Sequence, residues 1–409
     1  MNKKLIVIKF GGTSLGDIKR IKNAANIIKK EVKAGKNVIV VVSAIGKTTD
    51  DLQKLINNFN VNADIKEIDS ILSSGEQISS GLMVLALNNI GVKSRSFLGW
   101  QIPIITNTNY GKARILDINA NFLKKTLQKG ITPVIAGFQG ISEELRVSTI
   151  GRGGSDTTAV AIASKMSAHR CDIYTDVEGV YTTDPRLVKK ARKIKHLTYD
   201  EMLEMSSVGA QVLEPRSVSL AKKNNLLVTV RSSFKNVSGT KILKSKKMIE
   251  KRHVSGIVFS KNDAKISLLG IPDKPGAAAK IFGSLAKESI NVDMIVQNIS
   301  VDGKFSDLTF TVLQSDLIKA KKSINEIKKE VGIKNILPDS NVAKISIVGI
   351  GMRTNAGIAE DMFKVLAKEK INIDLISTSE IKISVLISRK HILKAINKLH
   401  KEFNLDNKN

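Results

Sequence analysis

Short runs of β-branched and aliphatic residues alternate with amphipathic stretches through about the first 230 residues. The stretch from Asp17 to Ala34 places isoleucines and alanines on one face, and Gly35 is suited to end it as a helix. Strands that alternate with helices of this length are typical of parallel βαβ units, with helices on both faces of the sheet. The runs predicted as buried strands are Leu5–Lys9, Asn37–Ser43, Ile131–Gly137, Cys171–Thr175 and Leu227–Arg231.

The last third of the chain contains an internal repeat. Ala264–Gly270 reads AKISLLG and Ala343–Gly349 reads AKISIVG, and each is followed by a similar pattern of apolar, Asn and Asp positions. Each copy predicts strand, helix, a second strand (Val292–Gln297 or Ile373–Thr378), a third strand and a helix. Such a βαββαβ unit is ferredoxin-like. Two copies are too few for a solenoid, so we expect two small modules packed side by side.

A polar stretch rich in Lys and Ser, residues 232–260, separates the two patterns and predicts a domain junction. We therefore expect an α/β domain in residues 1–245 and a junction in residues 246–263. The first module would follow in residues 264–337 and the second in residues 338–409.

The chain of 409 residues carries a net charge of +27, which first suggests a nucleic-acid partner. However, only 13 of its 65 basic residues are arginines, the lysines are spread along the chain, and aromatic residues make up 4%. Base and phosphate recognition favours arginine and stacking aromatics. We therefore interpret the charge as a solvated surface and expect no nucleic-acid partner; a salt-sensitive gel shift would reopen that alternative.

Targeting and redox signals point to a soluble, cytoplasmic, reduced protein. Cys171 is the single cysteine, and no Cys/His spacing suggests structural zinc. Lys9 interrupts the apolar stretch at the start, so no signal peptide is expected. No run of about 18 apolar residues predicts a membrane span.

Three glycine-containing or acidic segments lie where predicted strands meet helices or loops. Lys9–Ser14 (KFGGTS) ends the first strand, where a lysine and close backbone approach suit a phosphate; the alternative is a plain turn with Ser14 as N-cap. Gly151–Thr158 (GRGGSDTT) suits an anion nest, or is a flexible loop capped by Asp156. Thr175–Arg186 (TDVEGVYTTDPR) offers hydrogen-bond acceptors, an aromatic ring and a cation, or is a plain turn.

Glu76, in SSGEQ, is predicted to head an apolar helix over Gln77–Asn88, where an acidic residue is usually only a cap. Ser43, Thr48 and Thr49 end a strand and open a loop, which alone is weak support for function.

Taken together in their order, these segments closely resemble monofunctional aspartate kinases. The resemblance rests on KFGGTS, VVSAIGKTTD (Val41–Asp50), SSGEQIS (Ser73–Ser79), GRGGSDTTA and TDVEGVYTTDPR, and on the repeat, which matches the family's paired ACT modules. It covers nearly the whole chain. It implies an α/β amino-acid-kinase-like fold, with a parallel-rich sheet sandwiched by helices, followed by two ferredoxin-like ACT modules.

The resemblance also implies transfer of the γ-phosphoryl group of ATP, with Mg²⁺, to the side-chain carboxylate of L-aspartate. The product would be 4-phospho-L-aspartate, the entry to lysine, threonine and methionine biosynthesis. It assigns Lys9 and Asp156 to catalysis, with no separate protein metal site. It assigns ATP binding to Lys9, Phe10, Gly11, Gly12, Thr175, Asp176, Tyr181 and Arg186, and aspartate binding to Ser43, Thr49, Glu76, Arg152, Gly153, Gly154 and Ser155.

This chemistry agrees with the residue types present. A carboxylate with a reference pKa of about 3.9 is already ionised at pH 7, so its phosphorylation needs no strong general base. In-line placement and cancellation of charge are what the reaction requires. We expect Arg152 to bind the α-carboxylate of aspartate and Glu76 its α-ammonium.

The ACT pair implies feedback by an amino acid, lysine or threonine or both, bound between modules and across subunits of a homodimer or larger oligomer. The alternative is that the modules serve only dimerisation. The effector-binding positions implied are Asp273, Gly276, Ala278, Gln297, Asn372, Ile373, Ser379 and Glu380.

The chain departs from the family pattern at several positions. Ala356 replaces a common proline, Ala359 replaces a threonine of some relatives, Glu214 replaces a common histidine, and Gln211 replaces a lysine of some relatives. We expect neither Glu214 nor Gln211 to contact the core motifs. A kinase of the same fold for glutamate, acetylglutamate or UMP and a catalytically dead amino-acid sensor are the alternative functions. Met248 lies at the predicted junction, where an internal start would give a separate regulatory subunit, as in some relatives.

Overall fold

The computed structural model describes residues 3–59, 64–208, 212–244, 254–300, 303–350, 352 and 356–406. The chain forms two compact units. Unit 1 takes in Met1–Val180, Lys193–Ser206 and Gln211–Met248, and unit 2 takes in Tyr181–Arg192, Ser207–Ala210 and Ile249–Asn409. A short segment from the first half of the sequence, Tyr181–Arg192, therefore folds with the C-terminal unit.

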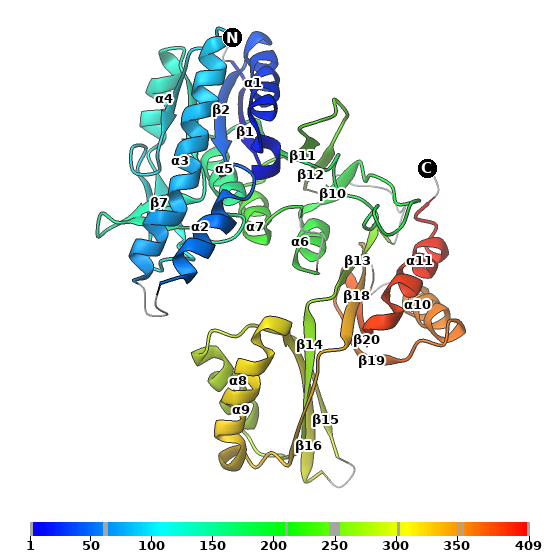
Figure 1. Cartoon of the computed structure of the whole chain (residues 1–409). Helices are drawn as coiled ribbons and strands as arrows, with labels where there is room; N and C mark the ends of the chain where they lie inside the picture. Colours follow the sequence, from blue (N-terminus) through cyan, green and yellow to red (C-terminus); the bar gives the residue numbers. More distant parts are fainter. Residues whose placement is uncertain are drawn as a thin grey trace. The chain divides into compact units, whose positions relative to one another are not determined.

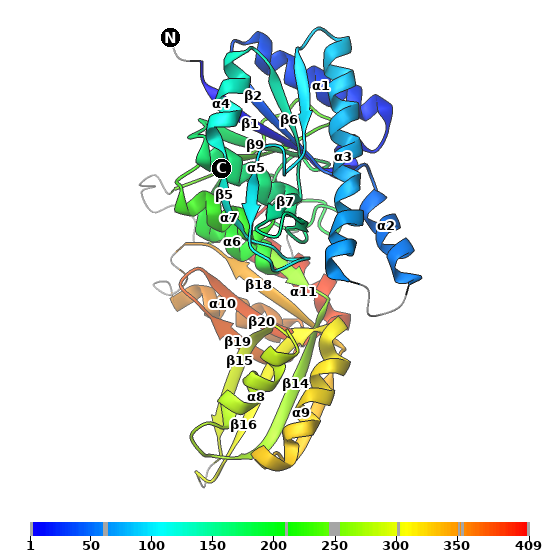
Figure 2. The same ribbon diagram turned by 90° about the vertical axis from the view of Figure 1, so that its left-hand side faces the viewer.

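An eight-stranded, mostly parallel sheet forms the centre of unit 1 (Figures 1 and 2), as the alternating pattern predicts. Its four central strands pair in the order β9-β1-β2-β6, all parallel. All five strands predicted from apolar runs are present. Along the sheet the strands are β10 (His196–Thr198), β12 (Thr240–Leu243), β11 (Val228–Ser232), β9 (Arg170–Thr175), β1 (Leu5–Phe10), β2 (Asn37–Val42), β6 (Thr132–Ala136) and β3 (Ser94–Phe97).

Helices cover both faces of this sheet. Ile6, Ile8 and Phe10 of β1 pack in one core with α1 (Ile18–Lys33) and α3 (Ile65–Asn89). The alternate face of β1 meets α5 (Gly154–Lys165), against which α7 (Pro215–Lys223) packs. The other helices of this region are η1 (Gly12–Leu15), α2 (Thr48–Asn57), α4 (Ala120–Gln128) and α6 (Tyr199–Val208). No helix in the described part of the chain is long and apolar enough to cross a membrane.

A second, smaller sheet in unit 1 has the order β5-β4-β7-β8. Its strands are β4 (Ile104–Thr106), β5 (Ile115–Ile118), β7 (Gln139–Ser142) and β8 (Val147–Thr149). The hydrophobic pattern does not predict these strands, because three or four residues are too few to show a period. The chain passes from β6 through β7 and β8 of this sheet into the glycine-rich segment at residues 151–154.

Module 1 of unit 2 is the βαββαβ fold that the first copy of the repeat predicts. Its elements are β14 (Asp263–Pro272), α8 (Ala277–Lys287), β15 (Val292–Ile299), β16 (Phe305–Leu313), η2 (Gln314–Asp316), α9 (Leu317–Val331) and β17 (Asn335–Asp339). The strands form an antiparallel sheet in the order β15-β16-β14-β17. Ile266 and Leu268 of β14 pack with Ile281 and Leu285 of α8 and Ile324 of α9.

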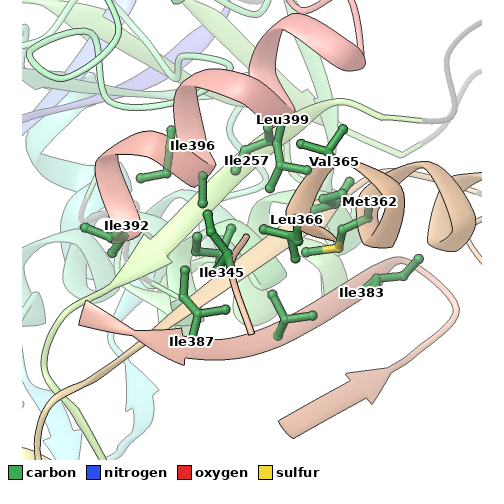
Figure 3. Packing of buried hydrophobic residues seen from close by; sticks show 14 of the residues in the cluster. Ile257, Ile345, Met362, Val365, Leu366, Ile383, Ile387, Ile392, Ile396 and Leu399 are labelled. Atoms are coloured by element: carbon green, nitrogen blue, oxygen red, sulfur yellow. The ribbon is translucent and has the colours of Figure 1, made fainter. Parts of the chain in front are cut away.

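Module 2 has the same arrangement but takes one strand from before module 1. It contains β18 (Val342–Val348), α10 (Ala356–Lys368), β19 (Ile373–Thr378), β20 (Lys382–Ser388), η3 (Arg389–His391) and α11 (Ile392–Glu402). Its sheet order is β13-β18-β20-β19, so β13 (Gly256–Ser260) stands where β17 stands in module 1. Figure 3 shows Ile257 of β13 in the core with Ile345, Met362 and Leu399. Residues 246–263, predicted as a junction, thus contain a strand of this module.

Two ion pairs join equivalent positions of the two modules reciprocally. Lys265 and Lys344 occupy the same place in the two AKIS segments, and Asp293 and Asp374 follow the two Asn-containing turns. Lys344 Nζ lies 2.5 Å from Asp293 Oδ2, and Lys265 Nζ lies 2.8 Å from Asp374 Oδ2. The modules also share a small apolar core, which includes Met294 and Leu375. They therefore pack side by side, as two copies of one fold.

The segment Tyr181–Arg192 is held within unit 2 by backbone and side-chain contacts. Thr182 Oγ1 lies 2.9 Å from His400 Nε2 of α11, and the amide of Ile257 donates to the Thr182 carbonyl at 2.7 Å. Arg192 Nε donates to the carbonyl of Leu405 at 2.7 Å. Val188 enters the apolar core of module 2. This part of the TDVEGVYTTDPR motif is therefore structurally a part of module 2.

Candidate active site

The carboxyl ends of the four central strands of unit 1 meet at one edge of the sheet. There the amide of Gly11 donates to the carbonyl of Tyr174 at 3.1 Å, and the amide of Ser43 donates to the carbonyl of Phe10, also at 3.1 Å. The amide of Gly137 continues the ladder to Val42 at 3.0 Å. Ligands of open α/β sheets bind at this edge. The predicted motifs that follow β1, β2 and β9 therefore meet at the same edge of the sheet.

Lys9 and Asp156 form a buried ion pair at this edge. The alternation of β1 turns Lys9 away from the α1–α3 core and toward α5, which carries Asp156 in its first turn. Lys9 Nζ lies 2.6 Å from Asp156 Oδ1, and the two side chains are 11% and 9% exposed. Burying an ammonium group is costly unless a partner of opposite charge accompanies it. The two residues predicted to be catalytic are thus in direct contact.

The KFGG segment forms a tight turn rather than an ordinary strand end. A Cβ at Gly12 would lie 2.8 Å from the carbonyl oxygen of Ala44, so only glycine allows this close approach. The amide of Gly46 in turn donates to the Gly12 carbonyl at 3.0 Å. The amide of Gly11 is already bonded to Tyr174, so this amide serves the fold. Phe10 is fully buried and stacks on Tyr174 with ring centroids 5.0 Å apart.

Glu76 is the third ionisable group that the fold brings to this edge, after Lys9 and Asp156. Its Oε1 accepts a hydrogen bond from the Ala44 amide at 3.0 Å, whereas its buried Oε2 has no hydrogen-bond partner among the described residues. Burial raises the pKa of Glu76 to about 7, against the opposing effects of the Ala44 amide and Lys9. The sequence places Glu76 at a helix start, and this is wrong, because it lies in the middle of α3. The helix continues through Gly75, where a Cβ would lie 2.7 Å from that of Ala44.

The GRGGSD segment turns from β8 into α5 through two left-handed glycines. Gly151 has φ 85° and Gly153, the N-cap of α5, has φ 65°. Gly154 and Ser155 are buried in the first turn of α5, beside Asp156. Arg152, by contrast, is exposed at the tip of the turn, and no described residue binds its guanidinium. The segment thus holds one free cation beside the Lys9–Asp156 pair.

The remaining predicted aspartate-binding residues, Ser43 and Thr49, flank the turn after β2. Both are half-buried, Ser43 directly after β2 and Thr49 in the first turn of α2. Glu76 is bonded to the residue that follows Ser43, so Ser43 and Glu76 belong to the same part of the site.

Glu214 packs directly against the glycine-rich turn. A Cβ at Gly153 would lie 2.5 Å from the Cβ of Glu214. Burial raises the pKa of Glu214, and the negative charge of Asp156 raises it further. The expectation that Glu214 stays away from the core motifs is therefore wrong. Gln211, about which the same was expected, lies outside the described residues.

The predicted nucleotide-binding residues fall in both units. Thr175 ends β9 beside β1, and its hydroxyl donates to Asp176 Oδ1 at 3.0 Å. These two residues belong to the strand edge that carries Lys9. Tyr181 and Arg186 belong to unit 2, where the Arg186 guanidinium pairs with Asp184 at 2.8 Å.

Comparison with known proteins identifies the family. Residues 4–232 match the model of the amino acid kinase family, and residues 266–327 and 345–403 match an ACT domain. An aspartokinase of Helicobacter pylori is 47% identical over 98% of this chain and all of its own, and an aspartate kinase of Pseudomonas putida is 45% identical over 98% of both chains. The chain belongs to the aspartokinase family.

Solved structures agree on the fold of this aspartokinase-family chain. Aspartokinase III of Escherichia coli, in complex with aspartate and ADP, superposes with a TM-score of 0.83 at 24% identity, covering 98% of this chain and 99% of its own. The same enzyme with lysine and aspartate gives a TM-score of 0.77 at 25% identity and the same coverage. The predicted fold, an α/β kinase domain followed by two ACT modules, is confirmed.

The implied effector residues of the aspartokinase pattern all lie in the ACT modules. In module 1, Asp273 follows β14, Gly276 caps α8 with φ 93°, Ala278 lies in α8 and Gln297 lies on β15. In module 2, Asn372 directly precedes β19, Ile373 begins it, and Ser379 and Glu380 form the turn before β20. β15 and β19 are neighbours within unit 2. Ala359 lies in α10, and Ala356 is the first residue of that helix.

Two charged residues near the site were missed by sequence reasoning. Asp69 of α3 is fully buried, and Arg216 of α7 donates to the carbonyls of Ile150 and Ala113 at 2.7 and 2.9 Å. A signal for Asp69 does exist: from residue 68 to the end of α3, Asp69 and Glu76 are the only charged residues, and they lie two turns apart on one face. For Arg216 the sequence offers no comparable signal, because both partners are remote in the chain.

Proposed function

We propose that this protein is an aspartate kinase, which transfers the γ-phosphoryl group of ATP to the side-chain carboxylate of L-aspartate. The observation that carries the proposal is the position of Glu76, a buried carboxylate with one unpartnered oxygen at the strand edge that holds the Lys9–Asp156 pair. A buried acceptor of this kind suits an ammonium group. The product would be 4-phospho-L-aspartate, at the entry to lysine, threonine and methionine biosynthesis.

Recognition of aspartate would use charges of both signs. Arg152 would bind the α-carboxylate through its two-pronged guanidinium, and Glu76 would bind the α-ammonium. Ser43, Thr49, Gly153, Gly154 and Ser155 would line the space around the substrate. Since both charged groups sit on one carbon of aspartate, their correct placement also directs the side-chain carboxylate.

Phosphoryl transfer would depend on charge cancellation by Lys9. A carboxylate attacks without losing a proton, so the protein needs no base for this step. Lys9 would lie against the phosphate oxygens, with Gly11 and Gly12 beside it, and would offset the negative charge that spreads over them. Asp156, at 2.6 Å, would hold the lysine ammonium in place when no nucleotide is bound.

ATP would bind together with Mg²⁺, and the residues present fit that ion. Mg²⁺ in phosphoryl-transfer sites keeps water molecules and is held by one or two carboxylates together with the substrate's phosphates. Asp156, in the first turn of α5 beside Lys9, would be the carboxylate that holds it. The ion would neutralise charge on the phosphate oxygens. Thr175 and Asp176 complete the nucleotide-binding set proposed for unit 1, in which the fully buried Phe10 would only support the strand end. Tyr181 and Arg186, which are also proposed for the nucleotide, belong to unit 2.

The ACT modules would bind an amino-acid effector, lysine or threonine or both, and shift the kinase between active and inactive states. Asp273, Gly276, Ala278 and Gln297 would form one side of that site, and the module 2 residues the other. We further propose a homodimer or larger oligomer through these modules. A cytoplasmic location is proposed as well, because the single cysteine, buried and free, suits a reducing compartment.

The test is an assay of purified protein for Mg·ATP-dependent acyl phosphate, trapped with hydroxylamine. Product with aspartate but not with glutamate would support the proposed reaction. Product that falls when lysine, threonine or both are added would identify the effector. Folded protein that binds ATP but phosphorylates no acidic amino acid would contradict the proposal.

A further inference from the structure

We propose that Asp69 is a positioning residue for the substrate amino acid: it fixes the turn that carries Arg152 relative to the helix that carries Glu76. The inference rests on the proposed function, in which Arg152 and Glu76 bind the two α-groups of aspartate. It adds a residue that touches neither substrate.

Asp69 is a fully buried carboxylate that accepts three hydrogen bonds. Its Oδ2 accepts from the amides of Gly111 at 2.9 Å and Thr149 at 2.7 Å, and its Oδ1 accepts from the Thr149 hydroxyl at 2.6 Å. Burying a carboxylate is costly unless donors of this kind surround it. Asp69 therefore links α3 by hydrogen bonds to two other segments of unit 1.

The segments of Thr149 and Gly111 both adjoin the glycine-rich turn. Thr149 ends β8 three residues before Arg152, and its carbonyl accepts from the amide of Ala113 at 2.9 Å. Gly111 touches the turn as well, since a Cβ at Gly151 would lie 3.2 Å from the Gly111 carbonyl oxygen. The start of the turn is thus fixed at the point where Asp69 binds.

The same helix carries Glu76 two turns further on, on the same buried face. Between the two carboxylates, the carbonyl of Ser73 accepts from the buried side chain of Gln139 at 2.9 Å, which ties α3 to β7. Because α3 is continuous from Asp69 to Glu76, the three hydrogen bonds of Asp69 set the separation of Glu76 from Arg152. A misplacement of about 1 Å between two groups that bind one substrate can cost about a hundredfold in rate.

The substitutions Asp69→Ala and Asp69→Asn test whether the hydrogen bonds of Asp69 position the substrate-binding residues, because Ala removes the acceptor oxygens and Asn keeps one of them. Asp69→Ala leaves the two amides without acceptors, and we expect the KM for aspartate to rise by about tenfold or more while the KM for ATP stays within about twofold. In Asp69→Asn the amide oxygen can keep both backbone donors, and the Thr149 hydroxyl can turn to accept from the new NH₂ group. That variant should keep the KM for aspartate within about threefold of the parent.

Two further variants complete the test. Thr149→Val removes only the hydroxyl donor and should raise the KM for aspartate by about threefold to tenfold. Asp117→Ala, which removes an exposed partner of Lys165 elsewhere in unit 1, is the matched control and should change neither KM. If Asp69→Ala does not fold, Thr149→Val and Asp69→Asn give the answer.

An unchanged KM for aspartate in folded Asp69→Ala, or in Thr149→Val where Asp69→Ala does not fold, would overturn the inference. A loss of kcat with both KM values unchanged would show that Asp69 has a purely structural role, and this result would overturn the inference as well. Failure of the proposed function looks different, because the parent protein would then lack activity toward aspartate.

Discussion

Lys344 Nζ lies between two carboxylates, 2.5 Å from Asp293 of module 1 and 3.5 Å from Asp263 at the start of β14. Lys344 and Asp263 are almost fully buried, with side chains 6% and 8% exposed. In the two reciprocal pairs of the repeat, Lys265 and Asp374 are 20% and 30% exposed, whereas Asp293, the reciprocal partner of Lys344, is 53% exposed. The two lysines are thus buried to different depths, and Lys344 has the buried Asp263 beside it, which lets the effect of burial be measured within one protein.

Replacing Lys344 by Met should destabilise unit 2 by about 2–4 kcal/mol, because Asp263 is left buried without a cation. Lys265→Met, the matched control, should cost about 1 kcal/mol or less, as more exposed pairs do. Urea denaturation of both variants measures the difference. Equal losses of stability in the two variants would show that the burial of Lys344 and Asp263 does not increase the cost of removing the lysine.

The Lys344–Asp293 pair also predicts a pH dependence of stability. Burial opposes ionisation of Asp293, but attraction and the hydrogen bond from Lys344 outweigh it and lower the pKa of Asp293 below its ordinary 3.8. The contribution of this ion pair to the stability of the folded state is therefore present above pH 3.8, and it is lost as the pH falls through the lower pKa that Asp293 has in the folded state.

Lys9→Met should reduce kcat of the hydroxylamine-trapped reaction by about a hundredfold to a thousandfold, as the loss of one charge-stabilising group does. The variant leaves Asp156 buried without its cation, so loss of folding could mimic loss of chemistry. The double variant Lys9→Met, Asp156→Asn removes that strain. It should fold as the parent does, by circular dichroism, and remain inactive; recovery of activity in it would contradict the role of Lys9.

The raised pKa of Glu76, about 7, predicts how catalysis responds to pH. Below pH 7 Glu76 gains a proton and loses the charge that attracts the α-ammonium of aspartate. Since the groups of aspartate itself do not titrate between pH 5 and 7, kcat/KM for aspartate should fall about tenfold per unit below pH 7. Glu76→Gln should be weakly active and independent of pH over this range.

Loss of folding does not explain such a fall in kcat/KM, because protonation of Glu76 stabilises the folded state. The folded state holds the Glu76 proton up to about pH 7, whereas the unfolded chain releases it near 4.5. The contribution of this group to stability is therefore fullest below pH 4.5 and is lost as the pH rises toward 7. A parent enzyme whose kcat/KM shows no inflection near pH 7 would contradict the assignment of Glu76.

Gly153→Ala should raise the KM for aspartate by about tenfold. A side chain at φ 65° costs about 1–2 kcal/mol, and its Cβ would collide with that of Glu214, so the turn with Arg152 must move. Gly283→Ala is the control, because it lies in α8 with no atom within 4 Å of a new Cβ. That change should stabilise the protein by about 0.5–1 kcal/mol without altering either KM.

The predictable parts of this fold are those whose signal is local. The five long apolar strands of unit 1 and both copies of the repeat follow from period and similarity alone. β13 was missed as a strand of module 2 because its partner β18 follows only after the whole of module 1. The apolar pattern predicts a helix over Gln77–Asn88, yet α3 begins at Ile65 and runs through Gly75, where Ala44 packs closely against the bare glycine backbone. The type of chemistry could be predicted from motifs, but the hydrogen-bond partners of Asp69 could not, since Gly111 and Thr149 are distant from it in the chain.

His400 predicts a second pH dependence, confined to unit 2. It is 2% exposed and bonded to Thr182 Oγ1, and burial lowers its pKa below 6.5, against the attraction of Asp406 and with the added repulsion of Arg192. The unfolded chain takes up a proton near pH 6.5, whereas the folded state resists it. Stability should therefore fall as the pH drops below 6.5, by up to about 1.4 kcal/mol per unit.

His400→Gln keeps a hydrogen-bonding side chain toward Thr182 but cannot titrate, so its melting temperature should lose this dependence between pH 5 and 7. The parent should melt about 2–4 °C lower for each kcal/mol lost. His169→Gln, at an exposed position of unit 1, is the control and should behave as the parent does. Parallel pH profiles for the parent and His400→Gln would show that His400 is not the titrating group. A flattened profile for His400→Gln alone would instead show that Thr182, within the TDVEGVYTTDPR motif, is held to α11 by a neutral histidine.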